Sequence, residues 1–322
     1  MSITVIVPVY NKVSAVEKCL QSIVNQKYTN YEVIIVNDGS TDGSETVIEK
    51  FLNDNRFHIV NEKNSGVSHA RNVGIKMAKK EHIVFIDADD YVDSNYFTEL
   101  LNGMEKNNDQ MTIISGFKMG GKSYTPPQQN LMKKDLINSY ANLSVFLNLP
   151  IGKLYSTNII HKYKILFDES IKYGEDLEFN LRYFSRSIIF QTVNYSAYHV
   201  VETDGGLSRS RVPMMLEYQR KVIITAQNTF GRNYDTLSGT QQIVIKASKT
   251  VLNHDLKFGM GCKIFSSHIE ELSQLLITMD HTHVKWDNFR SIQDNIVWIL
   301  IEKKMWVLLL IIFKIKSISA KL

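Results

Sequence analysis

The sequence predicts an α/β fold, in which a parallel sheet with helices on both faces is followed by a mostly helical C-terminal region. Two observations support this prediction. Over the first ninety residues, short apolar runs alternate with helical patterns, as in sheets built from strand–helix–strand units. From residue 213 onward, long helical patterns replace the strand-like runs. We therefore expect a sheet domain over residues 1–211, with halves 1–110 and 111–211, and a helical region over 212–322.

The composition is that of an ordinary globular protein. Hydrophobic residues make up 44% of the 322-residue chain and charged residues 22%, and the net charge of +4 is too small to indicate a nucleic-acid partner. Cys19 and Cys262 lie far apart without metal-ligand spacing, so we expect no disulfide framework, which suits a reducing cytoplasm. The chain opens directly on a strand-like run, so we also expect no signal peptide.

Strands are expected over residues 3–7, 32–36, 57–60 and 83–86, with a helix after each of the first three. The first helix should begin with a capping box from Ser14 to Glu17, and Asp42 should cap the second. The third should follow a turn at residues 64–66.

Polar loops leave three of these strands, at Asn11, Asp38 and Asp87. Right-handed crossovers place such loops on one edge of a parallel sheet, which is where ligands bind. The sequence therefore predicts a polar crevice at this edge.

The last of these loops reads Asp87-Ala88-Asp89-Asp90 and directly follows an apolar run. Side chains alternate along an extended segment, so Asp87 and Asp89 should point the same way. Two neighbouring carboxylates are stabilised by a cation between them, and Mg²⁺ or Mn²⁺ commonly bridges carboxylates to phosphates. A solvated acidic loop after a core strand is the alternative interpretation.

Residues 5–11, 36–42, 64–74 and 87–90, taken together and in this order, resemble the motifs of family 2 glycosyltransferases with the GT-A fold. The resemblance implies that the crevice binds a UDP-sugar with Mn²⁺ or Mg²⁺. It places Pro8 and Tyr10 beside the base, Asp38 on the ring of the base and Arg71 facing the nucleotide. It also places Asp87 near the ribose and makes Asp89 the metal ligand. Four further positions join the nucleotide-sugar site: Asn11, Asn64, Gly66 and Ala88. Arg71 in a helix-surface salt bridge, and Asn64 and Gly66 as plain turn residues, are the alternatives.

The second half of the sheet domain is expected to contain strands over 111–115, 153–155, 188–193 and 195–199, a hairpin or surface excursion over 116–127, and a helix near 136–147. A further helix should begin at Glu175 and Asp176. The helix dipole alone explains carboxylates in a first turn. The resemblance instead implies that Asp176 is the catalytic base, with Glu175 beside it in the donor site.

The loop over residues 202–211 combines a Gly-Gly pair with hydroxyl groups and arginines, a composition that suits a loop closing on phosphates. By the resemblance, Ser208 and either Arg209 or Arg211 would contact the diphosphate, and His199 would contact it or join Asp89 at the metal. A half-buried polar residue at a strand end is the alternative for His199.

Long helices are expected over residues 215–230, 240–256 and 264–279. Residues 305–313 then form an uninterrupted apolar run of nine, which is too short to span a bilayer and is flanked by lysines. Residues 296–322 are therefore expected either to contact a membrane surface peripherally or to pack as core or as an oligomer interface.

Together these features favour an inverting, metal-dependent transferase that moves a hexose or N-acetylhexosamine from a UDP-sugar to a glycan or lipid-linked glycan, in the cytoplasm at the inner membrane face. The expected pathway is synthesis of capsule or another cell-surface polysaccharide. A sugar-nucleotide pyrophosphorylase is disfavoured because residues 8–12 lack glycine, and a nicotinamide dehydrogenase because no G-x-G-x-x-G follows the first strand. A sugar-nucleotide-binding protein without activity is the remaining alternative.

Overall fold

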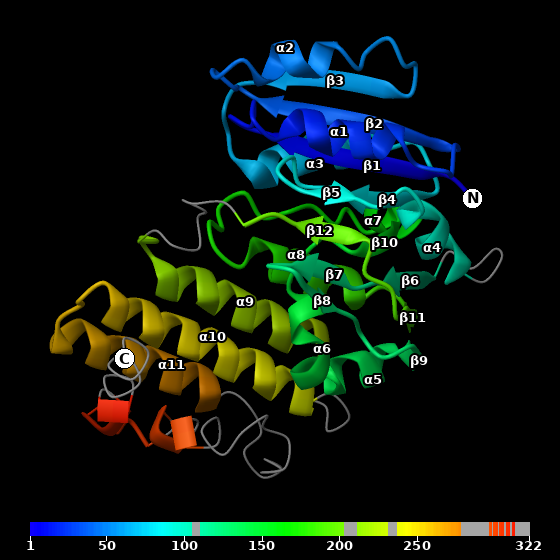
Figure 1. Ribbon diagram of the computed structural model, residues 1–322. Helices are drawn as coiled ribbons and strands as arrows, with labels where there is room; N and C mark the ends of the chain where they lie inside the picture. Colours follow the sequence, from blue (N-terminus) through cyan, green and yellow to red (C-terminus); the bar gives the residue numbers. More distant parts are fainter. Residues whose placement is uncertain are drawn as a thin grey trace. The chain divides into compact units, whose positions relative to one another are not determined.

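The computed structural model describes residues 1–104, 110–202, 211–230 and 237–277, together with 296–297, 299–301, 303–305, 307–309 and 311–312. These residues form two compact units. The sheet unit contains residues 1–133, 145–170 and 175–202 (Figure 1). The helical unit contains residues 134–144 and 171–174 together with the described residues from 211 onward.

The sheet unit is built on an eight-stranded sheet with the order β3-β2-β1-β4-β10-β6-β11-β9. Its strands are β1 (Ile3–Val9), β2 (Tyr31–Asp38), β3 (Phe57–Glu62), β4 (His82–Phe85), β6 (Met111–Ile114), β9 (Gln129–Met132), β10 (Lys153–Ser156) and β11 (Ile189–Thr192). The first four are parallel, whereas β10 runs antiparallel to both of its neighbours, β4 and β6. The predicted parallel sheet is thus confirmed for the first half, and the second half is mixed.

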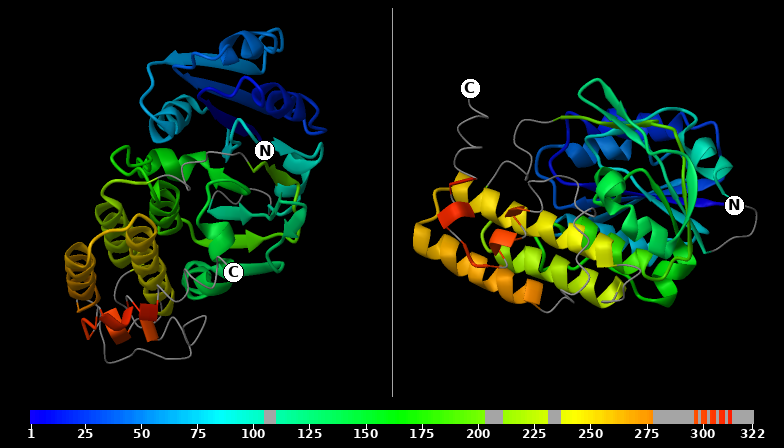
Figure 2. Two further views of the ribbon diagram at one scale, coloured as in Figure 1. Left: turned by 60° about the vertical axis from the view of Figure 1, so that its left-hand side comes forward. Right: turned by 90° about the horizontal axis from the view of Figure 1, so that it is seen from below.

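Helices cover this sheet and follow its strands in the predicted alternation (Figures 1 and 2). They are α1 (Val16–Val24), α2 (Ser44–Glu49), α3 (Val67–Met77), α4 (Tyr96–Asn102), α7 (Thr157–Lys162) and α8 (Glu175–Phe184). Helix α3 packs closely on β1 because Gly74 lies over Ile6, where a Cβ atom would come within 2.4 Å of the Ile6 side chain. This contact fixes the helix that carries Arg71.

The register of the parallel strands brings their carboxyl ends together. Val9 of β1 lies opposite Asn37 of β2, and Asp38 of β2 lies opposite Glu62 of β3. The backbone N–H of Ile86 donates to Ile6 and extends the pairing of β4 with β1 toward the same edge. The predicted convergence of the three polar loops is confirmed.

Two local predictions were wrong. Helix α1 starts after Ala15, without a side-chain cap, and the backbone carbonyl of Lys12 accepts from Ala15 and Val16 instead of a Ser14 capping box forming. Helix α2 is preceded by Gly43 in a left-handed conformation with φ of 93°, although Asp42 still accepts from the N–H of Ser44. A backbone carbonyl thus replaces the expected side-chain cap at α1, while at α2 Asp42 still bonds to the first helical residue from the position before Gly43.

A four-stranded sheet, β5-β12-β7-β8, flanks the main sheet in the same unit. Its strands are β5 (Tyr91–Val92), β7 (Phe117–Met119), β8 (Lys122–Tyr124) and β12 (Tyr198–Val200). Strands β7 and β8 form the hairpin expected over 116–127. Strand β5 directly follows the acidic loop and pairs with β12, so the loop is anchored at both of its ends.

The helical unit contains α9 (Met215–Phe230), α10 (Leu237–Lys257) and α11 (Cys262–Ile277). The single helix expected near 136–147 is two helices, α5 (Lys133–Asn138) and α6 (Tyr140–Leu147). A buried core joins α9, α10 and α11 to four residues of the C-terminal segment, Val297, Leu300, Ile301 and Leu309. Among the described residues, no helix has both the length and the apolar character needed to cross a membrane.

Candidate active site

The acidic loop after β4 is not extended as expected but turns at residues 88–89, where the Asp90 N–H donates to the Asp87 carbonyl at 3.0 Å, and its residues still alternate in exposure. Asp87 and Asp89 are partly exposed, with side chains 33% and 21% accessible, whereas Ala88 and Asp90 are buried. Asp87 and Asp89 therefore share the crevice side. The other two residues face the protein interior.

Asp90 is held by β12 and by the residue that follows it. Its carboxylate accepts from the Tyr198 hydroxyl at 2.7 Å and from the Val201 N–H at 2.8 Å, while the Tyr198 hydroxyl accepts from the Asp87 N–H. Burial, followed by the charge of Asp87, raises the pKa of Asp90 to about 7. Burial is the main cause of this rise, and the neighbouring carboxylates Asp87 and Asp89 add to it.

Arg71 of α3 joins the two halves of the sheet unit. Its Nη2 donates to Asp87 at 2.9 Å and its Nη1 donates to Asp176 at 2.8 Å. The side chain is buried, and the guanidinium lies over the Phe167 ring at 5.2 Å. Burial acts to lower the pKa of Arg71, but Asp176 and Asp87 outweigh burial and raise that pKa above its ordinary value. Arg71 therefore carries a permanent charge between two carboxylates.

Asp176 lies in the first turn of α8 and is reachable from the crevice, with a side chain 23% exposed. Burial raises its pKa to about 7, Arg71 acts against that rise, and Glu175 and Asp87 add to it. A carboxylate with a pKa near neutrality is well suited to accept a proton. Arg71 holds the orientation of Asp176 through its hydrogen bond, whereas burial is the main cause of the raised pKa.

Asp38 ends β2 and ties two loops together. One carboxylate oxygen accepts from the Ser65 N–H and the other from the Gly66 N–H, both at 2.8 Å. A Cβ atom on Gly39, whose φ is 72°, would lie 2.8 Å from the backbone nitrogen of Asn64, so the loops are also in close contact. Each carboxylate oxygen retains a second lone pair. Asp38 thus shapes the pocket and still has acceptor capacity for a ligand.

The residues at the end of β1 and in the loop after it differ in how exposed their side chains are. Pro8 is buried within β1, whereas Tyr10 is 47% exposed. Asn11 adopts a φ of 50°, and its side-chain oxygen accepts from the Thr41 N–H at 2.8 Å. The structure brings Tyr10 and Asn11 to the crevice edge but keeps Pro8 in the core.

Lys12 forms an ion pair with Asp89, with 2.5 Å between Nζ and the carboxylate oxygen. Among the described residues, no group of three or more His, Cys, Asp or Glu side chains has the arrangement of a metal site. Oxygen ligands from Asp87 and Asp89 nevertheless suit a hard cation, because positive charge stabilises neighbouring carboxylates. In this structure the Lys12 ammonium partly provides that charge.

His199 lies on β12, with Nε2 2.7 Å from a carboxylate oxygen of Asp93 and with its ring stacked on Tyr91 at 4.3 Å. These contacts account for one face and one nitrogen of the imidazole. The structure therefore shows His199 paired with Asp93, and not grouped with Asp89.

Ser208 and Arg209 lie outside the described residues. Arg211 is exposed in the helical unit, with a guanidinium nitrogen 3.8 Å from the Met260 sulfur. The sequence reasoning missed Lys12, Asp90 and Tyr198. A lysine directly after the first polar loop was a usable signal for Lys12, whereas the Tyr198 contact depends on strand pairing that no local pattern reveals.

A buried polar cluster supports the segment between α6 and β10. Lys153 donates to the carbonyls of Phe146, Leu149 and Ile151, while Asn180 of α8 donates to those of Leu147 and Leu149. Burial lowers the pKa of Lys153 to about 7, and Asp176 acts against that fall. Asn180 lies one turn after Asp176, so the cluster ties this segment to the helix of the candidate base.

Comparisons with known proteins agree with this geometry. The sequence profile described as Glycosyl transferase family 2 matches residues 4–164. The chain is 31% identical over 229 residues to an uncharacterized glycosyltransferase, EpsJ of Bacillus subtilis, covering 68% of this chain and 67% of EpsJ. It is also 31% identical over 211 residues to the poly(ribitol-phosphate) beta-N-acetylglucosaminyltransferase TarP of Staphylococcus aureus, a match that spans only 63% of either chain.

Solved structures share the fold at low sequence identity. A fragment of S. aureus TarS in complex with UDP-GlcNAc superposes with a TM-score of 0.64 at 19% identity, covering 85% of this chain and 84% of that one. The mannosyltransferase PcManGT from Pyrobaculum calidifontis, in complex with GDP-Man and Mn²⁺, gives a TM-score of 0.55 at 14% identity, covering 99% of this chain and 88% of that one.

Proposed function

The chain belongs to glycosyl transferase family 2 and has the GT-A fold, and we propose that it transfers a hexose or N-acetylhexosamine from a UDP-sugar to a hydroxyl of a glycan acceptor, with inversion. The observation that carries this proposal is the bridge made by Arg71. It links Asp87, at the donor edge of the sheet, to Asp176, at the start of α8. A donor-binding carboxylate and a candidate base are thereby held in one site.

The donor would lie along the carboxyl edge of β1, β2 and β4. Tyr10 offers an exposed ring for the base, and Asp38 retains acceptor capacity beside the loop of Asn64 and Gly66. The TarS fragment was solved with UDP-GlcNAc, which supports a uridine donor for this chain. Asp87, next to Ala88, would accept from the ribose.

Asp176 would act as the general base. The acceptor oxygen attacks the anomeric carbon from the face opposite UDP, its bond to that carbon forms as the bond to the diphosphate breaks, and its proton passes to Asp176. The products are the inverted glycoside, UDP and protonated Asp176, which then loses its proton to water. Glu175 would help to hold the donor sugar, and its charge keeps the pKa of Asp176 high.

The residues present fit a divalent cation. Asp89 would hold it, with Asp87 nearby, and the remaining ligands would come from the diphosphate and water, as is usual for Mg²⁺ and Mn²⁺. Such an ion stabilises negative charge on the leaving diphosphate. Lys12 would separate from Asp89 when the ion binds, and its ammonium would then be available to a phosphate oxygen. PcManGT was solved in complex with Mn²⁺, which supports the proposal of a divalent cation here.

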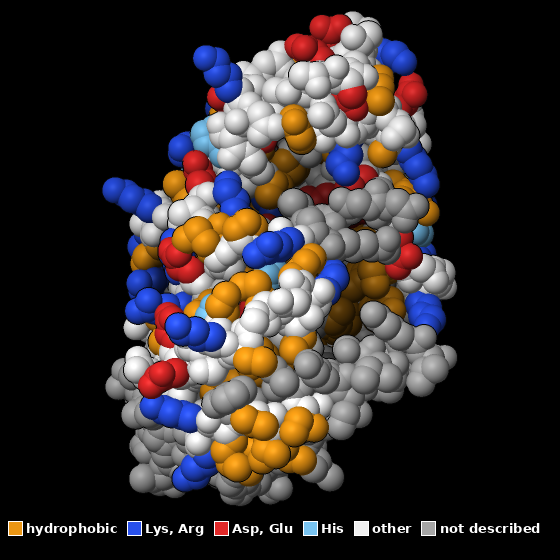
Figure 3. Space-filling view, turned by 90° about the vertical axis from the view of Figure 1, so that its left-hand side faces the viewer, with side chains coloured by type: hydrophobic (Ala, Val, Ile, Leu, Met, Phe, Trp, Pro, Cys, Tyr) orange, Lys and Arg blue, Asp and Glu red, His pale blue; other side chains and the backbone are white. Residues whose placement is uncertain are grey.

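The acceptor is proposed to be a lipid-linked glycan of capsule or another cell-surface polysaccharide, at the inner face of the cell membrane. TarP is named for transfer to poly(ribitol-phosphate), a related class of acceptor. The C-terminal segment exposes Met305, Val307, Leu308 and Ile311 beside two exposed lysines, Lys303 and Lys304. Figure 3 shows hydrophobic side chains gathered at the end of the molecule where Figure 1 places this segment. Such a surface suits peripheral contact with anionic lipid.

Turnover of the donor tests the proposal. Purified protein is incubated with UDP-glucose, UDP-galactose or UDP-N-acetylglucosamine, with Mn²⁺ or with EDTA, and the released UDP is measured. We expect one donor to be consumed in a metal-dependent reaction. Tight UDP binding without turnover of any donor, with acceptor-containing membranes present, would instead support the alternative of a binding protein without transferase activity.

A further inference from the structure

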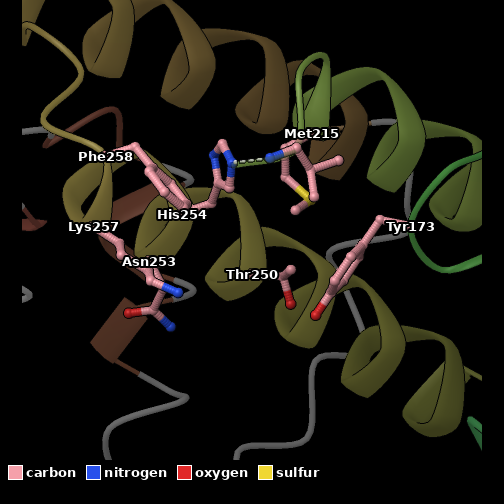
Figure 4. A pocket seen from close by; sticks show the side chains of 8 residues that line it. Tyr173, Met215, Thr250, Asn253, His254, Lys257 and Phe258 are labelled. Atoms are coloured by element: carbon pink, nitrogen blue, oxygen red, sulfur yellow. Dashed lines mark hydrogen bonds between the residues drawn. The ribbon is translucent and has the colours of Figure 1, made fainter. Parts of the chain in front are cut away.

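The helical unit contains a cavity of about 230 Å³ that the donor site does not use (Figure 4). Helix α10 supplies most of its wall, and the rest comes from α9, Val212 and the segment before α8. Its lining residues are Tyr173, Val212, Met215, Thr250, Asn253, His254, Lys257 and Phe258. Pockets for drug-sized ligands measure about 300–1,000 Å³, so this cavity suits one smaller unit.

The chemistry of the wall suits a sugar ring. Figure 4 shows the rings of Tyr173 and Phe258 on opposite sides of the view, with Thr250 between them and the amide of Asn253 on the same side as Phe258. Aromatic rings offer a flat apolar surface, and a few convergent hydroxyl, amide and ammonium groups give orientation and specificity. A monosaccharide presents the matching combination of C–H faces and hydroxyl groups.

Tyr173 is fixed in the wall and leads directly to the candidate base. Gln219 of α9 donates to the Tyr173 carbonyl at 3.3 Å, and Gly174 has a φ of 92° with no room for a side chain beside Val222. Asp176 follows Tyr173 by three residues, so the backbone alone keeps their Cα atoms within about 11 Å.

An adjoining cavity of about 140 Å³ shares His254, Val212 and Met215 with the first. In the described part of the chain, His254 Nδ1 and Asp255 Oδ1 have no hydrogen-bond partner, and the two atoms lie 3.8 Å apart. Asp255 is only 1% exposed, and its other oxygen is 2.7 Å from His268 Nδ1. Buried polar atoms of this kind are costly unless a ligand or water satisfies them.

We infer that the cavity lined by Tyr173, Asn253 and Phe258 binds one monosaccharide residue of the acceptor glycan. This inference rests on the proposed transferase function and gives its acceptor a place in the helical unit. The hydroxyl groups of the sugar would bond to Thr250, Asn253 and Lys257, and its ring would pack on the aromatic side chains.

Saturation-transfer NMR tests the inference with the methyl β-glycosides of glucose, galactose and N-acetylglucosamine. The variant Asn253→Trp fills the cavity from an exposed position on α10, and Asn228→Trp adds the same bulk at an exposed position on α9 outside the cavity. We expect saturation transfer to at least one glycoside with wild-type protein and with Asn228→Trp. With Asn253→Trp the signal should fall at least about tenfold, since blocking the cavity removes several contacts.

UDP binding is measured by calorimetry on the same three proteins, and we expect it to be unchanged. Absence of saturation transfer to all three glycosides with the wild type, or a signal that survives Asn253→Trp, would overturn the inference. If the wild-type protein does not bind UDP, the proposed function fails and not the inference about this cavity. Failure of the function and failure of the inference can therefore be told apart.

Discussion

Arg71 is the residue on which the geometry of the site depends. A buried guanidinium between Asp87 and Asp176 neutralises part of the negative charge of the crevice and fixes the orientation of the base. It does not make Asp176 a weak base, because burial, together with Glu175 and Asp87, outweighs its effect and leaves the pKa raised to about 7. The predicted alternative of a surface salt bridge is only half right: Arg71 forms salt bridges with Asp87 and Asp176, but its own side chain is buried.

The raised pKa of Asp176 predicts how activity depends on pH. The base must be ionised, and an elevated pKa favours the protonated form, so the active fraction grows as the pH rises. We expect kcat/KM for donor turnover to fall about tenfold for each pH unit below about 7 and to level off above it. Rates measured from pH 5 to pH 9 check this. Activity that is level from pH 5 upward would show that another group takes the proton.

Asp89 should be required for metal-dependent binding but not for folding. In Asp89→Ala, we expect UDP affinity in Mn²⁺ to drop to its value in EDTA, while the melting temperature stays the same or rises because a like charge is removed from beside Asp87 and Asp90. Asp54→Ala, a change in a carboxylate paired with Arg56 outside the crevice, is the control. UDP affinity is measured by calorimetry in the presence of Mn²⁺. If Asp89→Ala and the wild type then have the same affinity, the metal assignment is refuted.

At the scale of elements, the segment between α6 and β10 is held by side chains rather than by its own backbone pairing. Lys153 contacts the carbonyls of Phe146, Leu149 and Ile151, and Asn180 connects the same segment to α8. An ammonium inside a protein is costly, as the lowered pKa of Lys153 shows. The carbonyls it satisfies would be costlier still if left without a donor.

Lys153→Met keeps the length of the side chain and removes its donors. We expect the free energy of unfolding to fall by about 2 kcal/mol, because the relief from burying a charge is smaller than the loss at three carbonyls. The exposed Lys134→Met is the matched control and should change stability by less than about 0.5 kcal/mol. Urea unfolding measures both, and equal stability of Lys153→Met and wild type would contradict the role given to this lysine.

The C-terminal segment packs partly as core, which is one of the alternatives that its sequence left open, and contact with a membrane stays a prediction. Ile301 and Leu309 are buried in the core of the helical unit, while Val307 and Leu308 are exposed. A helix that was apolar on all sides had to be covered by protein or by lipid. In the described residues, one side of this segment is covered by protein and the other is open.

The two sides can be separated by mutation. Val307→Glu with Leu308→Glu should leave the fold intact and abolish co-sedimentation with liposomes rich in anionic lipid, whereas Leu309→Ala should destabilise the helical unit by about 2–5 kcal/mol without abolishing that binding. Wild-type protein that stays in the supernatant with such liposomes would rule out a membrane role for this surface.

At the scale of the whole molecule, the first half of the fold was predictable because each strand and helix carries its own local pattern. The four parallel strands and the helices between them follow from apolar periodicity, whereas Asp87 to Asp90 form a turn and not the extended segment that the sequence suggested. The antiparallel insertion of β10 between β4 and β6 was not predictable, because it depends on pairing between segments about seventy and forty residues apart.

The same distinction applies to the site. Asp38, Asp87 and Asp89 could be assigned to one crevice from the positions of the strand ends, and Asp176 from a motif. The contacts that set the chemistry of these carboxylates could not be predicted from the sequence. Arg71 and Asp176 are 105 positions apart, and Tyr198 and Asp90 are 108 positions apart. Lys12 and Asp89 pair because two loops meet, which no pattern within either loop indicates.

The central claim is that Asp176 takes the proton of the attacking hydroxyl while Arg71 and the sheet edge hold the donor, and one measurement tests it most directly. Donor turnover and UDP affinity are compared for wild type and Asp176→Asn, which keeps the shape of the side chain and its place at the start of α8 but cannot accept a proton at neutral pH. We predict a fall in kcat of at least ~10²-fold with UDP affinity changed by less than about threefold. Near-normal turnover in Asp176→Asn would contradict the account.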